Sequence, residues 1–506
     1  MTYIPHGHHR IAGKRVDSEE RFFSAPTTGS AFDFSAGSPE LVAEACAAAQ
    51  EAFAGFAATS REHRAKLLET IADEIDVRGD QITEIGSAET GLPTGRLQGE
   101  RGRTIGQLRL FAAHILAGEY LDRRHDTALP DRQPLPRPDL RMMQRPVGPV
   151  AVFGASNFPL AFSVAGGDTA AALAAGCPVV VKGHGAHPGT SEIIGDAIVA
   201  ALEKLGMDAG IFSLVQGGSR AVGEALVTDP RIKAVGFTGS LTGGRALFNL
   251  CAARPEPIPF FGELGSVNPM FVLPQAASAR GAEIGDGWAG SLTMGVGQFC
   301  TNPGIAIVLD GPDADTFVQS ATDGLSSIEA QTMLTDGIAD AYRSGVHRVS
   351  EGAGVKSLLS TSCEGRNAAP YLFEVSASDW MANEELSEEV FGPLGLVIRV
   401  KDAAQMKEVA KSFKGQLTAT LQMDDGDIDL ARDLLPVLER MAGRVMANGF
   451  PTGVEVSDAM VHGGPYPAST NFGATSVGTL SIRRFLRPVC YQNLPKALLP
   501  RDLVNV

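Results

Sequence analysis

Two short, uniformly apolar runs decide the fold of this chain: Pro149-Val150-Ala151-Val152-Phe153 and Pro178-Val179-Val180-Val181. Residues 169–175 between them and residues 190–205 after them have helical character. Apolar strands that alternate with helices are typical of a parallel sheet covered on both faces, because such strands are buried on either side. The chain is therefore predicted to be an α/β protein.

Two further strand-like runs follow, Ile211-Phe212-Ser213-Leu214-Val215 and Ala234-Val235-Gly236-Phe237, each ending in a glycine-rich turn before helical sequence. The second turn, Phe237-Thr238-Gly239-Ser240-Leu241-Thr242-Gly243-Gly244, can direct backbone N–H groups and the Ser240 hydroxyl toward a phosphate at a helix N-terminus. It is not a GxGxxG motif, so a turn required only by strand-to-helix geometry is an equally good interpretation. Together these patterns predict a nucleotide-type sheet.

The N-terminal third is predicted to be mainly helical. Apolar residues recur at helical spacing over 39–58 and 63–85, with Ser38 and Ser60 as plausible helix starts. A polar, proline-rich stretch at 123–138 is expected to be an exposed or edge segment before the first strong strand.

The composition is that of a large soluble protein of two to four domains. The chain has 506 residues and a net charge of −15. This acidic balance argues against a nucleic-acid partner, although it leaves room for a local basic pocket. The six cysteines lie far apart, with no CxxC motif and no Cys/His spacing suited to zinc. We therefore expect free thiols in a reducing cytoplasm and no bound metal.

No targeting or membrane segment is expected. The first ten residues lack the apolar core of a signal peptide, and His6, His8 and His9 are expected to lie in a solvated terminal segment rather than to bind a metal. The most apolar region, 151–181, is interrupted by polar, glycine and proline residues. It is too broken to span a bilayer.

A cysteine and a glutamate near the middle of the chain suggest chemistry on a carbonyl group. Cys300 ends the run Gly297-Gln298-Phe299-Cys300, and Glu263 lies 37 residues earlier (300 − 263 = 37) in Gly262-Glu263-Leu264-Gly265. A thiol can hold an acyl group as a thioester, which a carboxylate can release through one water molecule. A lone cysteine in an apolar stretch is more often a small buried hydrophobe, so the pair alone leaves both interpretations open.

Five segments, in order, match one family pattern. They are Ser156-Asn157-Phe158-Pro159, Val181-Lys182, Phe237-Thr238-Gly239-Ser240, Glu263-Leu264-Gly265 with Asn268-Pro269, and Gln298-Phe299-Cys300 followed by Glu389-Val390-Phe391-Gly392-Pro393. The chain resembles the aldehyde dehydrogenase superfamily over most of its length. The longer sequences around these motifs, including Cys300-Thr301-Asn302-Pro303-Gly304, are most similar to those of the 2,5-dioxovalerate (α-ketoglutaric semialdehyde) dehydrogenase group.

The resemblance implies an aldehyde dehydrogenase-like α/β fold with three parts. The expected parts are a Rossmann-type cofactor-binding domain (1–127 and 146–264), an α/β catalytic domain (265–477) and a small β oligomerisation arm (128–145 and 478–506). The arm implies a homodimer or homotetramer. Candidates for its strands are 140–145 and 481–487.

The resemblance also implies roles for the matched residues. Cys300 would attack an aldehyde, Asn157 and the Cys300 backbone N–H would hold the oxyanion, and Glu263 would activate the water that hydrolyses the thioester. The small-molecule substrate would be 2,5-dioxopentanoate, oxidised to 2-oxoglutarate. Medium or long aliphatic aldehydes, oxidised with NADP, are the alternative.

Residues implied to bind the cofactor are Lys182, Gly239, Ser240, Gly244, Glu389 and Phe391. Glu389 would hold the nicotinamide ribose with Phe391 beside the ring, and Lys182 would meet the adenosine ribose or its phosphate. Many family members carry a glutamate where this chain has Gly185, and that glutamate holds the ribose 2′-hydroxyl. Its absence favours NADP, or use of both cofactors, over strict NAD. A second departure, Gln216-Gly217-Gly218-Ser219, affects the pyrophosphate contacts.

Two other classes of function stay open on the residues alone. The first is acyl transfer, by a CoA-acylating relative or by a thiol hydrolase. A CoA-acylating relative commonly lacks the base that Glu263 supplies, and a thiol hydrolase normally needs a histidine partner for which no sequence signal is found. The second is a catalytically silent protein on the same scaffold, which the presence of Cys300, Glu263 and Asn157 disfavours.

Overall fold

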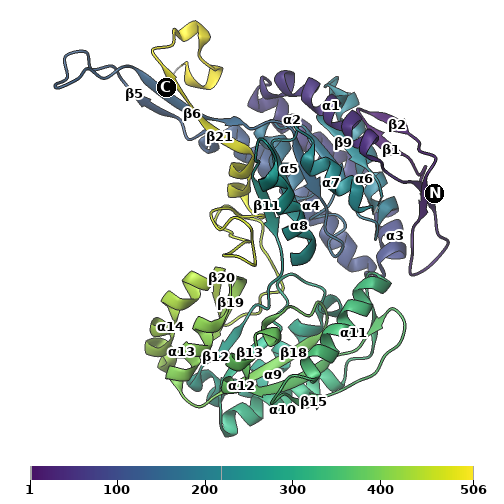
Figure 1. Cartoon of the computed structure of the whole chain (residues 1–506), viewed down its shortest axis with the longest axis vertical. Coiled ribbons are helices and arrows are strands. Elements are labelled where there is room, and N and C mark those ends of the chain that lie inside the picture. Colours follow the sequence, from purple (N-terminus) through teal and green to yellow (C-terminus); the bar gives the residue numbers. More distant parts are fainter. Residues whose placement is uncertain (1–2, 218, 505–506) are drawn as a thin grey trace.

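Two seven-stranded sheets, each in its own lobe, organise the part of the chain that the computed structural model describes, residues 3–217 and 219–504 (Figure 1). The first sheet has the order β11-β10-β7-β8-β9-β1-β2, and the second has the order β15-β17-β18-β13-β12-β19-β20. The chain passes from one sheet to the other between β11 and β12. The prediction of an α/β protein is confirmed.

The first sheet is parallel from β11 to β9, and β1 joins β9 in the antiparallel sense. Its strands are β1 (His9–Ile11), β2 (Lys14–Val16), β7 (Val150–Phe153), β8 (Val179–Lys182), β9 (Phe212–Val215), β10 (Ala234–Thr238) and β11 (Phe260–Glu263). The chain runs outward through β7, β8 and β9, then returns to place β10 and β11 on the other side of β7. This reversal beside β7 is where doubly wound sheets bind ligands, at the carboxyl ends of the strands.

Alternate residues of β7 and β8 enter two different hydrophobic cores, which is why both runs are uniformly apolar. Val150 and Val152 pack into the core formed with α2 to α6, whereas Ala151 and Phe153 pack into the core formed with α1 and α7. The helices of this lobe are α1 (Pro39–Ala57), α2 (Arg61–Val77), α3 (Gly79–Thr90), α4 (Thr94–Ala117), α5 (Gly167–Ala175), α6 (Pro188–Leu205), α7 (Arg220–Thr228) and α8 (Leu241–Ala253). Ser38 and Ser60 cap α1 and α2 through their side chains, as predicted.

The second sheet is parallel except for β15 at its edge. Its strands are β12 (Met270–Val272), β13 (Ile305–Leu309), β15 (Lys356–Leu359), β17 (Tyr371–Ser376), β18 (Leu394–Val400), β19 (Gln416–Gln422) and β20 (Ala442–Ala447). Its helices are α9 (Pro274–Thr293), α10 (Pro312–Ser326), α11 (Asp336–Ser350), α12 (Ala377–Ala382), α13 (Ala403–Ser412) and α14 (Ile428–Met441). Met270 and Val272 face one core while Phe271 faces the other, so this sheet is also covered on both faces.

A three-stranded antiparallel sheet extends away from both lobes (Figure 1). It consists of β5 (Arg124–Asp126), β6 (Leu140–Pro146) and β21 (Leu486–Gln492). The expectation of a strand at 481–487 is correct only for its last two residues, because β21 begins at Leu486 and residues Thr479–Phe485 form a 3₁₀ segment, most of whose side chains are buried. There Arg484 pairs with Asp168 at 2.6 Å. The small sheets β3 (Arg21–Phe23) with β4 (Asp33–Ser35) and β14 (Gln331–Thr332) with β16 (Asn367–Ala368) complete the strands.

The histidines near the N-terminus are not solvated, contrary to the expectation. His9 is fully buried in β1, and its Nδ1 accepts the backbone N–H of Gln216 at 3.0 Å. The backbone N–H of His6 donates to the buried carboxylate of Glu192 at 2.7 Å. The N-terminal segment is held against α6 because the buried carboxylates of α6 need hydrogen-bond donors, which this segment supplies. None of the helices in the described residues combines the length and the apolar character needed to cross a bilayer.

Candidate active site

The predicted site residues gather where the carboxyl ends of strands in the first sheet meet the amino ends of strands in the second. Lys182 ends β8 and Glu263 ends β11, whereas Cys300 lies just before β13 and Glu389 just before β18. Because β12 follows β11 after only six residues, Glu263 lies just before this crossing between the two sheets and Cys300 lies after it in the chain.

A tight turn presents Cys300. Gly295, Val296 and Gly297 all have positive φ, at 57°, 60° and 66°. A Cβ atom on Gly297 would collide with the carbonyl carbon of Gly392, so only glycine fits here. The turn that carries the cysteine therefore rests directly on the Phe391-Gly392-Pro393 segment.

Asn268 holds the backbone at Cys300. Its side-chain N–H groups donate to the carbonyl oxygens of Cys300 and Asn302, each at 2.9 Å. Its own backbone N–H donates to Gln416 Oε1 on β19 at 3.0 Å. Asn268, which belongs to the matched Asn268-Pro269 motif, thus links the segment between β11 and β12 to the loop that carries Cys300 and to the second sheet.

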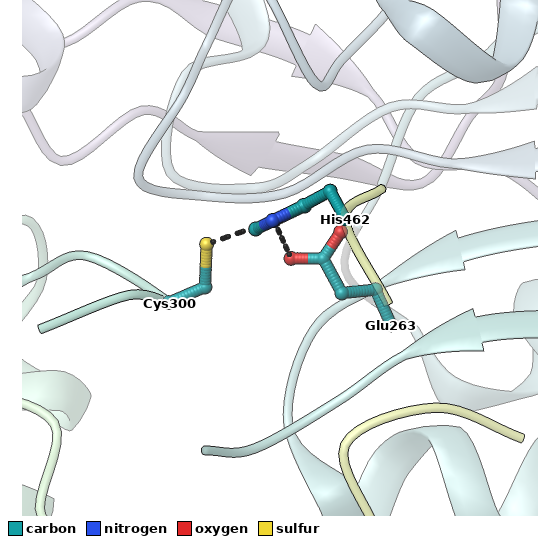
Figure 2. A group of neighbouring side chains, drawn as sticks. All are labelled: Glu263, Cys300 and His462. Carbon is teal, nitrogen blue, oxygen red and sulfur yellow. Dashed lines mark hydrogen bonds and ion pairs between the residues drawn. The ribbon is translucent and has the colours of Figure 1, made fainter. Parts of the chain in front are cut away.

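His462 lies between the thiol and the carboxylate (Figure 2). Its Nε2 atom is 2.9 Å from Glu263 Oε1 and 3.4 Å from Cys300 Sγ, and Ser476 Oγ donates to Glu263 Oε2 at 2.5 Å. The side chains of His462 and Glu263 are 1% and 2% exposed. Sequence reasoning missed this histidine, because it lies 162 residues beyond Cys300 in a glycine- and proline-rich segment without periodicity.

Burial and hydrogen bonding set the proton distribution of this group. Burial opposes ionisation of Glu263, but attraction to His462 and hydrogen bonds from His462, Ser476 and Cys300 outweigh it, so the pKa of Glu263 lies below its usual value. Burial raises the pKa of the Cys300 thiol well above its usual range, and the Glu263 charge raises it further. The resting pair is therefore a thiol beside a carboxylate.

The same three side chains could ligate a divalent metal, although the sequence predicted none. Their donor atoms lie within 4.8 Å of one another, and they are the one such grouping found among the described residues. Thiolate, imidazole and carboxylate are all zinc ligands.

Asn157 approaches the cysteine loop from the end of β7. Its side chain is buried, and its Nδ2 donates to the carbonyl oxygen of Gln298 at 3.0 Å. One of its two side-chain N–H groups is thereby bound to Gln298, two residues before Cys300. The second N–H remains for another acceptor at the same place.

Lys182 is a cation at the end of β8 without an acidic partner among the residues described. Burial alone lowers its pKa to about 8. His184, two residues on, lies close enough for repulsion from Lys182 to help lower its own pKa well below the usual value. The local environment therefore favours a bound anion. In the other departure from the family pattern, Ser219 replaces the usual glycine and is the N-cap of α7, while Gly218 lies outside the described residues.

The glycine-rich turn after β10 begins α8, as its sequence suggested. Ser240 is the N-cap, and its Oγ accepts the backbone N–H of Gly243 at 3.3 Å. The Gly239 N–H donates to the carbonyl oxygen of Glu263 at 3.1 Å. A Cβ atom on Gly244 would approach the Leu264 side chain too closely, so glycine here allows α8 to pack tightly beside the end of β11. The turn thus lies directly beside Glu263.

Glu389 and Phe391 line a small cavity of about 30 Å³ together with Gly297 and Phe299. Burial raises the pKa of Glu389 to about 8, and the charge of Glu263 acts in the same direction. Glu389 therefore lies close enough to Glu263 for the two charges to interact.

Three arginines surround the thiol. Arg96 and Arg103 extend from α4 and Arg444 from β20, and the negative charge of the ionised Cys300 sulfur acts on all three guanidinium groups. Burial lowers the pKa of each. The Arg103 Nε and Nη2 atoms are buried without a hydrogen-bond partner in the part of the chain described. Such N–H groups are available to an acidic ligand.

The chain was then compared with known proteins. A sequence model described as "Aldehyde dehydrogenase family" matches residues 17–471. The chain is 52% identical to "Alpha-ketoglutaric semialdehyde dehydrogenase 2" of Azospirillum brasilense, with 98% of this chain and 97% of that protein covered. It is 49% identical to an alpha-ketoglutaric semialdehyde dehydrogenase of Acinetobacter baylyi, with 92% and 89% covered. A crystal structure of a betaine aldehyde dehydrogenase mutant from Staphylococcus aureus superimposes with a TM-score of 0.83 at 20% identity, covering 97% of this chain and 96% of that one.

Proposed function

We propose that this chain, which belongs to the aldehyde dehydrogenase family, oxidises 2,5-dioxopentanoate to 2-oxoglutarate with NADP or NAD. The observation that carries the substrate is the identity of about one half to two α-ketoglutaric semialdehyde dehydrogenases over nearly the whole chain. The arginines around Cys300 support it, because this substrate carries a carboxylate remote from the aldehyde.

In the proposed reaction Cys300 supplies the nucleophile. Its proton passes to Glu263, and the thiolate forms a C–S bond with the aldehyde carbon while the carbonyl electrons move to oxygen. The free N–H of Asn157 and the backbone N–H of Cys300 donate to that oxygen, and loss of one such donor typically costs about 100- to 1,000-fold in rate.

The nicotinamide cofactor, when bound, accepts the hydride that the carbon releases on becoming a thioester. Lys182, Gly239, Ser240, Gly244, Glu389 and Phe391 would hold it. The partnerless cation at Lys182 fits the 2′-phosphate of NADP, and Gly185 places no fixed negative charge nearby. NADP is therefore the preferred cofactor in this proposal, with NAD also used.

Glu263 then releases the thiol proton to solvent and, again a carboxylate, acts a second time. It takes a proton from water as the water oxygen bonds to the thioester carbon, and the C–S bond breaks to return the Cys300 thiolate and a free carboxylic acid. Because both oxygens of Glu263 are already hydrogen-bonded, the carboxylate is held in one orientation beside the sulfur.

The proposal extends to the division of the chain. The first lobe, 1–127 and 146–264, would bind the cofactor, and 265–477 would supply the nucleophile. The segments 128–145 and 478–506, which hold β21 and most of β6, would join subunits into a homodimer or homotetramer.

A substrate series tests the proposal. We expect kcat/KM to be highest for 2,5-dioxopentanoate, lower for succinic and glutaric semialdehydes, and lowest for unsubstituted aldehydes from propanal upward. Steady improvement with alkyl length, by about 0.8 kcal/mol for each buried CH₂, together with poor use of every acid, would eliminate the dioxopentanoate assignment. Formation of acyl-CoA instead of free acid would indicate the acyl-transferring alternative.

The arginines allow a matched comparison on one helix. Arg103→Met should reduce kcat/KM for 2,5-dioxopentanoate by roughly 10- to 100-fold while changing that for butanal little, because a buried charged hydrogen bond is lost only with the acid. Arg109→Met is the control, since Arg109 is an exposed residue of α4 that pairs with Asp73. Equal losses on both substrates would remove Arg103 from carboxylate recognition.

A further inference from the structure

A cavity of about 690 Å³ lies at the base of the three-stranded sheet. Its walls come mainly from the start of α2, the segment between α4 and β5, the strands β6 and β21, and residues 498–502. Sites for small organic molecules typically have volumes of about 300 to 1,000 Å³. The residues that line this cavity include none of the candidate active-site residues, so it is a separate feature of the molecule.

The C-terminal segment forms one side of the cavity and is attached to its other walls. It lies beside the three-stranded sheet (Figure 1). Arg61 Nε, at the start of α2, donates to Asp502 at 3.0 Å, and Arg141 Nη1, on β6, donates to the carbonyl oxygen of Leu503 at 2.9 Å. The cavity is therefore bounded by segments that hydrogen bonds hold together.

Positive charge is concentrated around this cavity. Five guanidinium groups line it against two carboxylates, although the whole chain has a net charge of −15. One of the carboxylates, Asp502, is already paired with Arg61. The guanidinium groups belong to Arg61, Arg64, Arg123, Arg145 and Arg501, and the carboxylates to Glu62 and Asp502. Because like charges around one space repel each other, a bound anion would stabilise the arrangement.

Arg64 is buried, with 6% of its surface exposed, and forms no ion pair with the residues described. Its Nε and Nη1 atoms donate to the carbonyl oxygens of Ala174 and Thr59, and Nη2 donates to the Tyr120 hydroxyl at 3.0 Å. All of these acceptors are uncharged, and a second N–H on Nη2 is left over. Buried charges are ordinarily paired with an opposite charge, so the cavity lacks a counter-ion for Arg64.

Two further guanidinium groups in the cavity are free to bind. Arg145 on β6 is half-buried and Arg123 is exposed, and neither forms an ion pair or a side-chain hydrogen bond within residues 3–217 and 219–504. A guanidinium group can hold a carboxylate or a phosphate through two parallel N–H groups. Apolar side chains complete the walls, including the buried Leu121 and Met143. These would contact carbon atoms, which favours an organic anion over an inorganic one.

We propose that this cavity is a binding site for an organic anion with at least two carboxylate or phosphate groups. Arg64, Arg123 and Arg145 would hold the charged groups, and the Tyr120 hydroxyl, which accepts from Arg64, would donate its own proton to the same ligand. The inference goes beyond the proposed function and does not depend on it, because it uses neither the aldehyde nor the nicotinamide cofactor.

Calorimetry with the full chain and two probes tests the proposal. Citrate represents the polycarboxylates and fructose 1,6-bisphosphate the organic phosphates, each at an ionic strength kept constant with NaCl. We expect saturable binding of at least one probe with a Kd below about 1 mM. Either preference supports the site, and the probe with the lower Kd identifies the chemical class of the ligand.

Single substitutions locate the bound probe. Arg145→Gln and Arg123→Gln should each raise the Kd by roughly tenfold, because each removes one charged hydrogen-bonding group from the ligand. Arg440→Gln is the matched control: Arg440 is an exposed arginine of α14 with no ion pair in the described ranges, and its loss should leave the Kd within about twofold. Without a probe, Arg145→Gln should raise the thermal midpoint, because it relieves repulsion between like charges. A purely structural role of Arg145 predicts a lower midpoint instead.

Four results would overturn the proposal. The first is no saturable binding of either probe, and the second is binding that Arg123→Gln and Arg145→Gln both leave unchanged. The third is binding that is lost in Arg103→Met or Lys182→Met but kept in Arg145→Gln, since the probe would then occupy the substrate or cofactor region. The fourth is a change in molecular mass by light scattering in Arg145→Gln without binding in the parent, which would assign the arginines to contacts between subunits.

Discussion

Raising the pH from 7 to 9 is expected to weaken NADP binding while leaving NAD binding almost unchanged. Burial lowers the pKa of Lys182 to about 8, so this lysine loses its positive charge as the pH rises through that value. In the free enzyme roughly ten in eleven molecules carry the charge at pH 7, and roughly one in eleven at pH 9. If only the charged form binds the 2′-phosphate, affinity falls in proportion, by roughly tenfold.

Calorimetry without aldehyde tests this directly, because it measures cofactor affinity alone. Turnover, which ionisation of the thiol would also change, does not enter the measurement. The phosphate itself has its second pKa near 6, so its charge changes little above pH 7. Lys182→Arg should remove the pH dependence, since a guanidinium stays charged throughout. A parallel change for NADP and NAD, or an unaltered pH dependence in Lys182→Arg, would refute the assignment of Lys182 to the 2′-phosphate.

Four other variants follow from the site. Gly185→Glu should lower the preference for NADP over NAD by roughly 10- to 100-fold, measured as a ratio of kcat/KM values, because a close like charge costs about 1 to 3 kcal/mol; an unchanged ratio would contradict this. Cys300→Ser should abolish aldehyde oxidation while cofactor affinity is retained, and activity within a few-fold of the parent would exclude Cys300 as nucleophile. Glu263→Gln should slow the first turnover as well as stop hydrolysis of the thioester, because the proposed mechanism uses Glu263 both to accept the thiol proton and to activate water; an undiminished burst of NADPH followed by a stall would show that Glu263 is not needed before hydride transfer. Gly297→Ala should destabilise the cysteine loop by about 1 to 3 kcal/mol and lower the thermal midpoint, whereas Gly290→Ala, in open space on α9, should not; equal midpoints would contradict the steric argument.

Local patterns predicted the first lobe well. The apolar runs became β7 and β8 because every residue in them is buried, and the serines before α1 and α2 became caps because their side chains can reach free N–H groups nearby. Such features depend on neighbours a few residues apart, which a sequence displays directly.

The site was only partly visible in the sequence. Family motifs indicated Cys300, Glu263 and Asn157, and the structure brings these three together. His462 was not predicted because its partners are distant in sequence and its own segment has no helical or strand period. The burial of His9 was not predicted either, because it depends on pairing between β1 and β9, which are distant in the sequence.

The end of β11, which carries Glu263, forms backbone contacts with residues about two hundred positions later in the sequence. The Leu264 N–H donates to the carbonyl oxygen of Ala468, and Glu263 forms a bridge with Ser469. His462 and Ser476, which hold the carboxylate, come from the same late segment. During synthesis the first lobe can fold around β7 to β10 while this corner is still incomplete. A nascent or truncated chain that ends before residue 462 therefore has Cys300 but lacks the residues that hold the Glu263 carboxylate, so in the proposed mechanism it would be inactive.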